Sequence, residues 1–311
     1  MIDRNLELFV RAAEYGSITK AAKASYITQP AVSNAILKLE NELGVKLFLR
    51  DKRNGLLLTD VGKQILILAR QMEEIDNRIY QCACREKNMM GGKLRIAVLT
   101  SLVTTILSKA LKEYRSLYPG IDIEIKEGTP NDIFEMIEEH AADFAVSCSP
   151  FGRFHAVSLI RDRIMAVFPP DSREKKAVSL GDPPDMLIIN KPAYETILGH
   201  ITRKDSVRLD SVLIVQNAET AIRMTADGIG VGIVSEYTLD TLAPDCPKYP
   251  VDPQITFDIG LFANDLKDLT PAAAEFIRLI RENPAFHGRE KAAQPWPELQ
   301  EEDVCRSYCR D

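Results

Sequence analysis

The sequence predicts a chain of mixed class, with a small N-terminal helical domain, one long helix and a two-lobed α/β domain. Three observations support this prediction. Apolar residues recur at helical spacing through the first sixty residues, a seven-residue apolar repeat then begins at Val61, and short apolar strands finally alternate with helical segments. At 311 residues the chain is long enough for two or three domains.

The composition is that of an ordinary soluble globular protein, with 45% hydrophobic and 27% charged residues. No apolar run approaches the roughly 20 residues that span a bilayer, and the N-terminus enters an amphipathic helix without a secretory signal. We therefore expect a cytoplasmic protein with no membrane partner, whose six cysteines are reduced thiols. Because its cysteines and histidines do not show zinc-site spacing, we expect neither a metal ion nor a cofactor.

The N-terminal segment contains two short helices followed by a third that begins beside a proline. The first helix ends at Gly16, and Ser17 can cap the second. Thr28 can cap the third, in whose first turn Pro30 loses no hydrogen bond. A short turn between two helices, the second with small polar groups at its start, is typical of a helix-turn-helix that reads DNA. The residues predicted to contact bases or phosphates are Thr28, Gln29, Pro30, Ser33, Asn34 and Lys38.

A basic hairpin is predicted after these helices. Apolar runs at 47–49 and 56–58 flank Asn54-Gly55, a strong hairpin-turn signal. The hairpin would form a wing in which Arg50, Lys52 and Arg53 meet phosphates or a minor groove, and Thr59 adds a contact to the DNA backbone. Residues 1–59 carry nine lysines and arginines against six acidic residues, a balance of +3 in a chain of net charge −6. This asymmetry supports a DNA-binding domain at 1–59.

The same segment resembles the winged helix-turn-helix of the LysR-type transcriptional regulators. The resemblance implies a non-enzymatic, ligand-responsive regulator that binds a dyad-symmetric operator in double-stranded DNA, assembles as a homodimer or homotetramer and contacts RNA polymerase. The residues that carry it are Phe9, Ala13, Gly16-Ser17, Ala21-Ala22, Gln29-Pro30-Ala31-Val32-Ser33, Ile36, Leu39-Glu40, Leu43-Gly44, Leu47-Phe48, Arg50, Leu58-Thr59 and Gly62. A small helical domain without DNA-binding activity is the alternative for this segment.

Residues 60–90 are predicted to form one linker helix with an apolar seam. The spacings along the seam alternate between four and three residues, which is a heptad repeat. A single helix cannot bury such a stripe alone, so we expect it to pair with its copy in a dimer, although packing against its own domain would satisfy the same pattern. The predicted dimerisation residues are Val61, Ile65, Leu68, Met72, Ile75 and Ile79.

Residues 91–286 alternate between strands and helices, which predicts largely parallel sheets covered by helices. We expect one lobe at about 91–162 with 266–286 and a second at about 163–265, with the chain crossing between them near 161–163 and 264–267. This resembles the effector-binding domain of LysR-type regulators, which is built like a periplasmic solute-binding protein. The residues that carry this resemblance are Tyr118-Pro119-Gly120-Ile121, Glu127-Gly128-Thr129, Asp143-Phe144-Ala145-Val146 and the glycine run at 228–233. We interpret the glycines of this run as a helix C-cap.

Residues 287–311 form a polar extension that we expect to be disordered.

Ligands of open α/β sheets bind beyond the carboxyl ends of the strands, where helix N-termini attract anions. Polar residues at the predicted strand ends and helix starts should therefore converge on one cleft, and we expect a small anionic metabolite as the effector. The predicted effector-binding residues are Thr100, Ser101, Thr129, Ser147, Cys148, Asn190, Glu219 and Thr220.

Two other classes of function remain open. A solute-binding protein with an N-terminal dimerisation segment would need export and would not bind DNA. An α/β enzyme could use Cys148 with His155, but nothing in the sequence orders a triad around them, and it contains no G-x-S-x-G, P-loop or H-E-x-x-H motif.

Overall fold

The computed structural model describes residues 3–51, 55–86, 90–169, 171–172, 177–184, 186–200, 208 and 211–282. The chain divides into two compact units, Met1–Gly92 with Glu138–Ala141, and Lys93–Ile137 with Ala142–Asp311. Lys52 and Arg53 of the predicted wing and the predicted extension at 287–311 lie outside the described residues. No helix in the described part of the chain is both long and apolar enough to cross a membrane.

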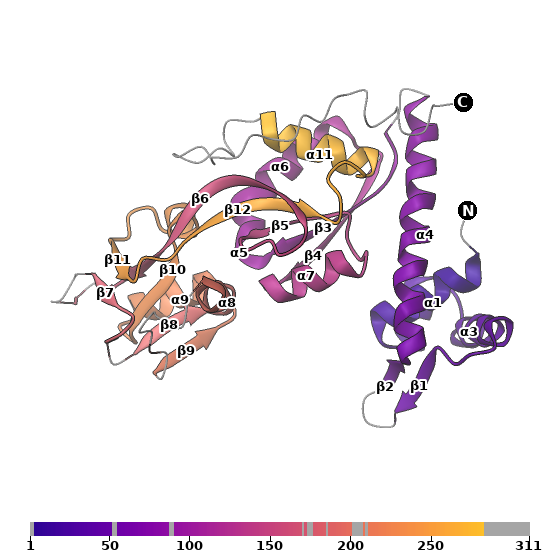
Figure 1. Ribbon diagram of the computed structural model, residues 1–311, viewed down its shortest axis with the longest axis horizontal. Coiled ribbons are helices and arrows are strands. Elements are labelled where there is room, and N and C mark those ends of the chain that lie inside the picture. The colour runs from indigo at the N-terminus through magenta and orange to yellow at the C-terminus, as the bar shows by residue number, and fades with distance from the viewer. Residues whose placement is uncertain are drawn as a thin grey trace. The chain divides into compact units, whose positions relative to one another are not determined.

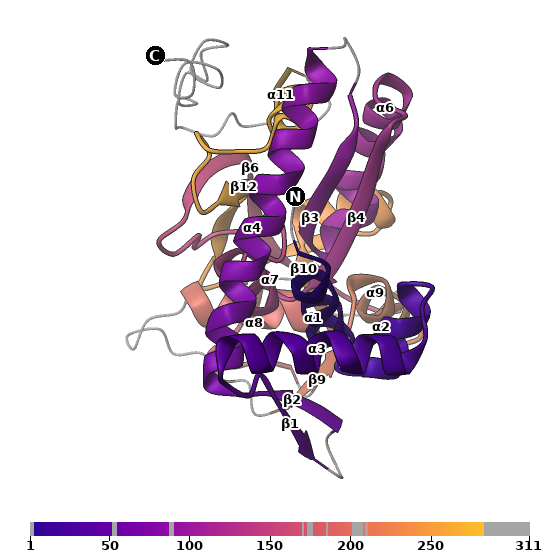
Figure 2. The ribbon, with the colours of Figure 1, turned by 90° about the vertical axis from the view of Figure 1, so that its right-hand side faces the viewer.

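The first unit is a winged helix-turn-helix followed by a long helix (Figure 2). Its core is formed by apolar side chains of every element, with Phe9, Val32 and Leu47 completely buried. The carboxylate of Glu40 joins the third helix to the wing because its Oε1 accepts a hydrogen bond from the Leu47 backbone N–H at 2.9 Å. The elements are α1 (Arg4–Tyr15), α2 (Ile18–Ala24), α3 (Gln29–Leu43), β1 (Phe48–Asp51), β2 (Gly55–Leu58) and α4 (Asp60–Arg85).

The second unit contains two α/β lobes. The first lobe comprises β3 (Gly92–Leu99), the consecutive helical segments α5 (Thr100–Leu102), η1 (Val103–Leu107) and α6 (Ser108–Leu117), β4 (Ile121–Gly128), α7 (Pro130–Glu138), β5 (Phe144–Cys148), the start of β6 (His155–Val167), β12 (Thr256–Ala263) and α11 (Pro271–Glu282). The second comprises the end of β6, β7 (Val178–Ser179), β8 (Leu187–Asn190), α8 (Lys191–His200), β9 (Val212–Val215), α9 (Ala218–Ala226), β10 (Val231–Ser235), α10 (Glu236–Leu242) and β11 (Lys248–Asp252).

One long strand, β6, belongs to the sheets of both lobes (Figure 1). It pairs antiparallel with β12 from His155 to Arg163 and antiparallel with β10 from Ile164 to Val167. The strands run in the order β4-β3-β5-β12-β6-β10-β8-β9. Arg163 and Ile164 therefore mark the first crossing between the lobes.

The second crossing differs from the prediction. It lies between β11, which pairs with β6 in the second lobe, and β12, which already pairs with β5 in the first. The chain has thus returned by Thr256 rather than at 264–267. The reason is that an apolar strand has the same sequence pattern in either lobe, so only its pairing partner shows where it belongs.

The glycine run at 228–233 ends one helix and starts a strand, as predicted. Gly228 has a left-handed φ of 82° and follows the C-cap of α9. The N–H groups of Gly228 and Ile229 donate to the carbonyls of Thr225 and Met224 at 3.0 and 3.1 Å, which is a Schellman motif. Strand β10 then begins at Val231.

A buried ion pair fixes the start of the first lobe. The Arg95 guanidinium of β3 donates to Asp143 Oδ1 through Nε at 3.0 Å and Nη2 at 2.7 Å, and the Arg95 backbone N–H donates to Oδ2 at 2.8 Å. Both residues are buried. The resulting geometry aligns β3 with the beginning of β5, its parallel neighbour.

Candidate functional sites

The start of α3 presents an exposed polar surface. Thr28 is the N-cap in extended conformation and makes no side-chain capping bond, so its hydroxyl is not engaged at the helix start. Gln29, Pro30, Asn34 and Lys38 are exposed and Ser33 is half-buried, whereas Val32 and Ile36 on the opposite face are buried. The predicted recognition residues therefore share the outer surface of a helix whose inner face is held by the core.

The turn before α3 contains an exposed tyrosine in a left-handed backbone conformation, which the sequence analysis did not predict. Tyr26 has a left-handed φ of 55° and is 96% exposed. This backbone conformation, which costs a non-glycine residue about 1–2 kcal/mol, lets the Ile27 N–H donate to the Ala22 carbonyl at 3.0 Å. A left-handed turn position usually holds glycine or asparagine, so the tyrosine at this position gave no local sign of the conformation.

The wing is formed by β1 and β2, whose register pairs Arg50 with Leu56. Arg50 thus lies in the first wing strand. Thr59 has a structural role: its hydroxyl accepts from the Gly62 N–H at 2.9 Å, which caps α4, and donates to the Lys46 carbonyl at 2.8 Å. A contact to DNA would have to compete with both bonds.

Helix α4 carries an apolar stripe exposed along its length. Leu68 is 59% and Ile79 61% exposed, and Val61, Met72 and Ile75 are exposed as well. Ile65 differs from the rest of the predicted seam because it packs against the core of the helical domain. The seam is therefore not buried within its own unit.

A pocket lies between the two lobes of the α/β domain. The space within it amounts to about 380 Å³ when the part open to solvent is counted. Its lining comprises Leu99, Ser101, Leu102, Cys148, Phe257 and Ile259 from the first lobe, and Ile164, Asn190, Pro192, Ala193, Thr196, Ala218, Ser235 and Thr238 from the second. The structure thus brings together Ser101, Cys148 and Asn190 of the eight predicted residues.

The other five predicted effector residues lie outside this lining. The Thr100 hydroxyl donates to the Gly128 carbonyl at 3.4 Å, and the Thr129 hydroxyl donates to Asp132 Oδ2 at 2.8 Å. Ser147 is completely buried beside Cys148. Glu219 and Thr220 are exposed in the first turn of α9, where Asn217 caps the Thr220 N–H. The hydroxyls of Thr100 and Thr129 are thus bonded to other groups of the protein, which sequence alone does not reveal.

Thr196 was missed because it lies in the second turn of α8 rather than at its start. Ser235 and Thr238 were missed because the sequence analysis did not predict α10. Cys148 Sγ lies 3.1 Å from the Thr196 hydroxyl, which itself donates to the Pro192 carbonyl at 2.9 Å. Since that hydroxyl has a single proton, the thiol is the donor in the first contact. Burial raises the pKa of Cys148, so the group is a neutral thiol near pH 7 and unsuited to nucleophilic attack. His155 is exposed and contacts Asp265 instead.

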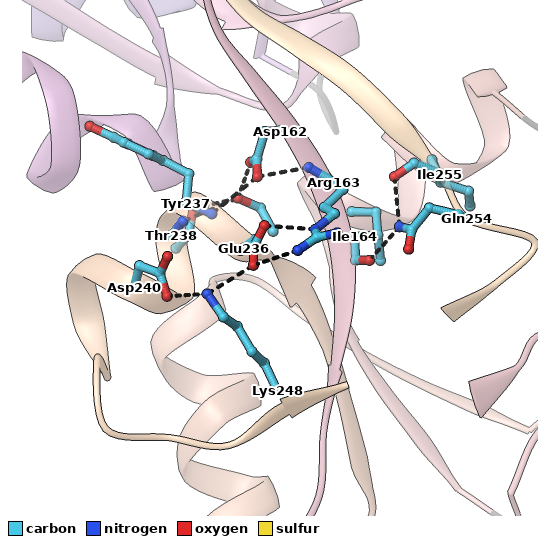
Figure 3. A network of polar contacts seen from close by, with 11 residues as sticks. Asp162, Arg163, Ile164, Glu236, Tyr237, Thr238, Asp240, Lys248, Gln254 and Ile255 are labelled. Carbon is cyan, nitrogen blue, oxygen red and sulfur yellow. Dashed lines mark hydrogen bonds and ion pairs between the residues drawn. The ribbon is translucent and has the colours of Figure 1, made fainter. Parts of the chain in front are cut away.

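A polar network connects this pocket to the first crossing (Figure 3). Asp162 is buried on β6 and its carboxylate accepts from the Ser235 hydroxyl at 2.6 Å and from the Arg163 and Tyr237 N–H groups at 2.8 and 3.1 Å. The neighbouring Arg163 guanidinium binds Glu236 through Nε at 2.7 Å and Nη2 at 3.1 Å. This bond holds the pKa of Glu236 at about 2, although burial acts in the opposite direction.

The network continues to the strand before the second crossing. Lys248 of β11 pairs with Glu236 and with Asp240 of α10 (Figure 3). The start of α10 is therefore tied both to the strand that enters the second lobe and to the strand that leaves it. No group of three or more potential metal-binding side chains occurs among the described residues.

Two family models match almost the whole described chain. The bacterial regulatory helix-turn-helix protein, lysR family, matches residues 4–63, and the LysR substrate binding domain matches residues 87–285. A winged helix-turn-helix followed by a two-lobed α/β domain with a pocket between its lobes defines the class of DNA-binding regulators that carry a small-molecule-binding domain. The chain belongs to the LysR family of these proteins and is a DNA-binding transcriptional regulator with a substrate-binding domain.

Related chains span nearly the same length. The uncharacterized HTH-type transcriptional regulator YoaU of Bacillus subtilis (strain 168) is 40% identical over 280 residues, covering 89% of this chain and 97% of its own. YvbU of the same organism is 33% identical over 284 residues, with the same two coverages of 89% and 97%.

Solved structures show the same fold. A full-length single-residue variant of OxyR from Pseudomonas aeruginosa has a TM-score of 0.69 at 19% identity, covering 95% of this chain and 99% of its own. Full-length CbnR complexed with its target DNA has a TM-score of 0.57 at 18% identity, covering 90% and 99%.

Proposed function

We propose that this regulator binds a dyad-symmetric operator as a homodimer and that a small-molecule effector bound between the lobes controls its action on transcription. The observation that carries the proposal is the exposed polar start of α3 in a helix-turn-helix whose other face is buried. Such a helix fits the major groove with its N-terminal residues at the base edges. Its site of action is then the cytoplasm, where the operator lies.

The roles of the recognition residues follow from their chemistry. Gln29 and Asn34 can each pair with an adenine through two hydrogen bonds, whereas Thr28, Ser33 and Lys38 suit phosphate oxygens. Pro30 suits the first turn, where its missing N–H loses no hydrogen bond, and it lies on the same exposed surface. Arg50, Lys52 and Arg53 provide the positive charge of the wing, which contacts backbone phosphates or the minor groove.

The exposed stripe of α4 supports the dimer. An unpaired heptad seam of Val61, Leu68, Met72, Ile75 and Ile79 is stabilised when it packs against its copy. A two-fold axis between two such helices places two α3 helices on two half-sites. We extend this proposal to the homotetramer and to contact with RNA polymerase because the family resemblance implies both.

The pocket supports the effector role. It is bounded by both lobes, so a ligand that contacts both favours one inter-lobe angle over another. A ligand shifts such an equilibrium only through unequal affinity for the two states. Ser235 offers a route, since it lines the pocket and bonds the Asp162 carboxylate at the first crossing.

The first experiment is fluorescence anisotropy of the purified full-length protein with a duplex from upstream of its own gene, over a salt series, with a scrambled duplex of equal length as the control. We expect preference for the upstream duplex and an affinity that falls steeply with salt, whose slope counts the phosphate contacts. If neither this duplex nor genome-wide selection of DNA fragments returned a preferred sequence, the solute-binding alternative would replace the regulator.

A further inference from the structure

Most polar side chains of the pocket form hydrogen bonds with other groups of the protein. The thiol of Cys148 donates to Thr196, and Thr196 donates to the Pro192 carbonyl. The Ser235 hydroxyl donates to Asp162 and accepts from the Thr238 N–H at 3.1 Å. These groups shape the pocket but leave few donors and acceptors for a ligand.

Asn190 differs from these residues. It is 3% exposed, lines the pocket and directly precedes α8, the position from which a side-chain oxygen ordinarily caps a helix. Among the described residues, its Oδ1 is a buried acceptor without a hydrogen-bond partner. Leaving such an atom unpaired is costly, and a ligand that donates a hydrogen bond here would remove that cost.

The start of α8 adds a second preference. Pro192 and Ala193 of its first turn line the pocket. The backbone N–H groups of a first helical turn have no partners within the helix and carry a partial positive charge, which suits a carboxylate. Pro192 has no N–H, so Ala193 supplies the backbone donor on this side of the pocket. Of the described residues that line the pocket, none is charged. One negative charge therefore suits the pocket better than a phosphate or a dicarboxylate, which would need a cationic side chain.

The remaining lining is aliphatic or aromatic, with Leu99, Leu102 and Ile164 next to Phe257 and Ile259. This surface favours a short hydrocarbon chain. We infer that the effector is an aliphatic 2-hydroxy monocarboxylate, whose carboxylate lies at the start of α8 and whose hydroxyl donates to Asn190 Oδ1. The inference rests on the effector role proposed above and names the ligand class.

Related acids fit less well. A 2-oxo acid offers only acceptors beside its carboxylate and leaves Asn190 Oδ1 unpaired. A 2-amino acid brings an ammonium with three donors, and the nearest buried carboxylate, Asp162, already accepts three hydrogen bonds and does not line the pocket. An acid without a 2-substituent can place its carboxylate at the start of α8, but it has no group that donates a hydrogen bond to Asn190 Oδ1.

The test is isothermal titration of the full-length protein with a matched set of six-carbon acids: 2-hydroxy-4-methylpentanoate, 4-methylpentanoate, 2-oxo-4-methylpentanoate and leucine, and with the corresponding four-carbon set. We expect the 2-hydroxy acid of one set to bind at least about tenfold more tightly than its three analogues, which is the worth of one buried hydrogen bond. Tighter binding of the 2-oxo, 2-amino or unsubstituted acid would overturn the inference.

Substitution of the acceptor gives a second readout. Asn190→Leu and the smaller Asn190→Ala both lack an acceptor, so each should remove the preference for the 2-hydroxy acid over 4-methylpentanoate. Thermal unfolding shows which of the two variants is folded. Arg223→Gln on the exposed side of α9 is the control and should keep the preference. A preference retained in a folded Asn190 variant would overturn the inference.

The two proposals fail in different ways. Absence of binding by every acid in a protein that still selects its operator contradicts the ligand class alone. A protein that selects no operator contradicts the proposed function, whatever acids it binds.

Discussion

The Ser235 hydroxyl donates a 2.6 Å hydrogen bond to Asp162 Oδ2 and thereby joins a pocket residue of the second lobe to the strand that crosses between the lobes. Asp162 accepts two further bonds, from the N–H groups of Arg163 and Tyr237. If a ligand displaces the start of α10, then either Asp162 moves with it or the hydrogen bonds between them break. Burial of the same carboxylate makes the stability of the domain sensitive to pH.

The first prediction concerns Asp162. Burial raises its pKa above the ordinary 3.8 despite the three hydrogen bonds. A carboxyl with a raised folded-state pKa contributes stability at low pH that is lost as pH rises from the unfolded-state value through the folded-state value. Asp162→Asn removes this loss, so the stability of the variant relative to wild type should rise with pH over that window.

Urea unfolding at a series of pH values measures this difference. Asp122→Asn, at an exposed position of β4, is the control for the change of an aspartate to an asparagine. A relative stability of Asp162→Asn that stays flat or falls as pH rises would contradict the expected direction.

The second prediction concerns Arg163 and Glu236. The Arg163 guanidinium, opposed by burial, holds the pKa of Glu236 at about 2, below its ordinary 4.5. A lowered pKa contributes stability above the unfolded-state value that is lost as pH falls through the folded-state value. Because the pair is partly exposed, Arg163→Gln should cost ~0.5–1 kcal/mol at pH 7.

That cost should shrink as the pH is lowered from 4.5 towards 2. Chemical denaturation at both ends of this range is the measurement, with Arg223→Gln, whose side chain is 80% exposed, as the control of little expected effect. A cost that persists unchanged in acid would show that Arg163 acts through packing rather than charge.

The third prediction separates two possible roles of Thr59. Because its hydroxyl caps α4 and bonds the Lys46 carbonyl, Thr59→Ala should cost ~1–2 kcal/mol of stability. Thr59→Ser keeps the hydroxyl and should retain most of it. Operator affinity, measured well below the melting temperature, should change little in both variants. If Thr59→Ala instead lowered operator affinity without lowering stability, Thr59 would contact DNA as the sequence predicted.

The fourth prediction concerns the apolar stripe of α4. Leu68→Glu combined with Ile75→Glu places charges on a seam that is exposed in the protomer, so the helix should persist while self-association fails. Light scattering should show a lower mass than for wild type at equal concentration. Lys63→Glu, on an exposed position of α4 away from the seam, is the control and should keep the wild-type mass.

The fifth prediction distinguishes base contacts from phosphate contacts on α3. Asn34→Ala should reduce the preference for operator over scrambled DNA, by ~1–3 kcal/mol for a lost bidentate contact. Lys38→Ala should weaken both duplexes alike and lower the salt slope by about one. Fluorescence anisotropy of both variants with both duplexes over a salt series measures these effects. If Asn34→Ala lowered the salt slope and Lys38→Ala reduced the preference for the operator, the two assigned roles would be reversed.

The sequence by itself determined the features of this protein that depend on local spacing. Helical periodicity with Ser17, Thr28 and Pro30 at helix starts predicted the helix-turn-helix, and Asn54-Gly55 predicted the hairpin between β1 and β2. The glycine run predicted the helix end at Gly228. Each depends on residues a few positions apart, whose backbone preferences do not need the rest of the chain.

Only the tertiary structure decided which polar groups meet. The pocket assembles residues from Leu99 to Ile259 across two lobes, and it includes three of the eight predicted residues. Thr59, Thr100 and Thr129 resemble binding residues in sequence, yet their hydroxyls bond groups of their own chain. Asn190 stands at a position typical of a helix N-cap, yet its side-chain Oδ1 is buried without a hydrogen-bond partner. Hydrogen bonds between distant segments depend on packing, which residue type and spacing do not encode.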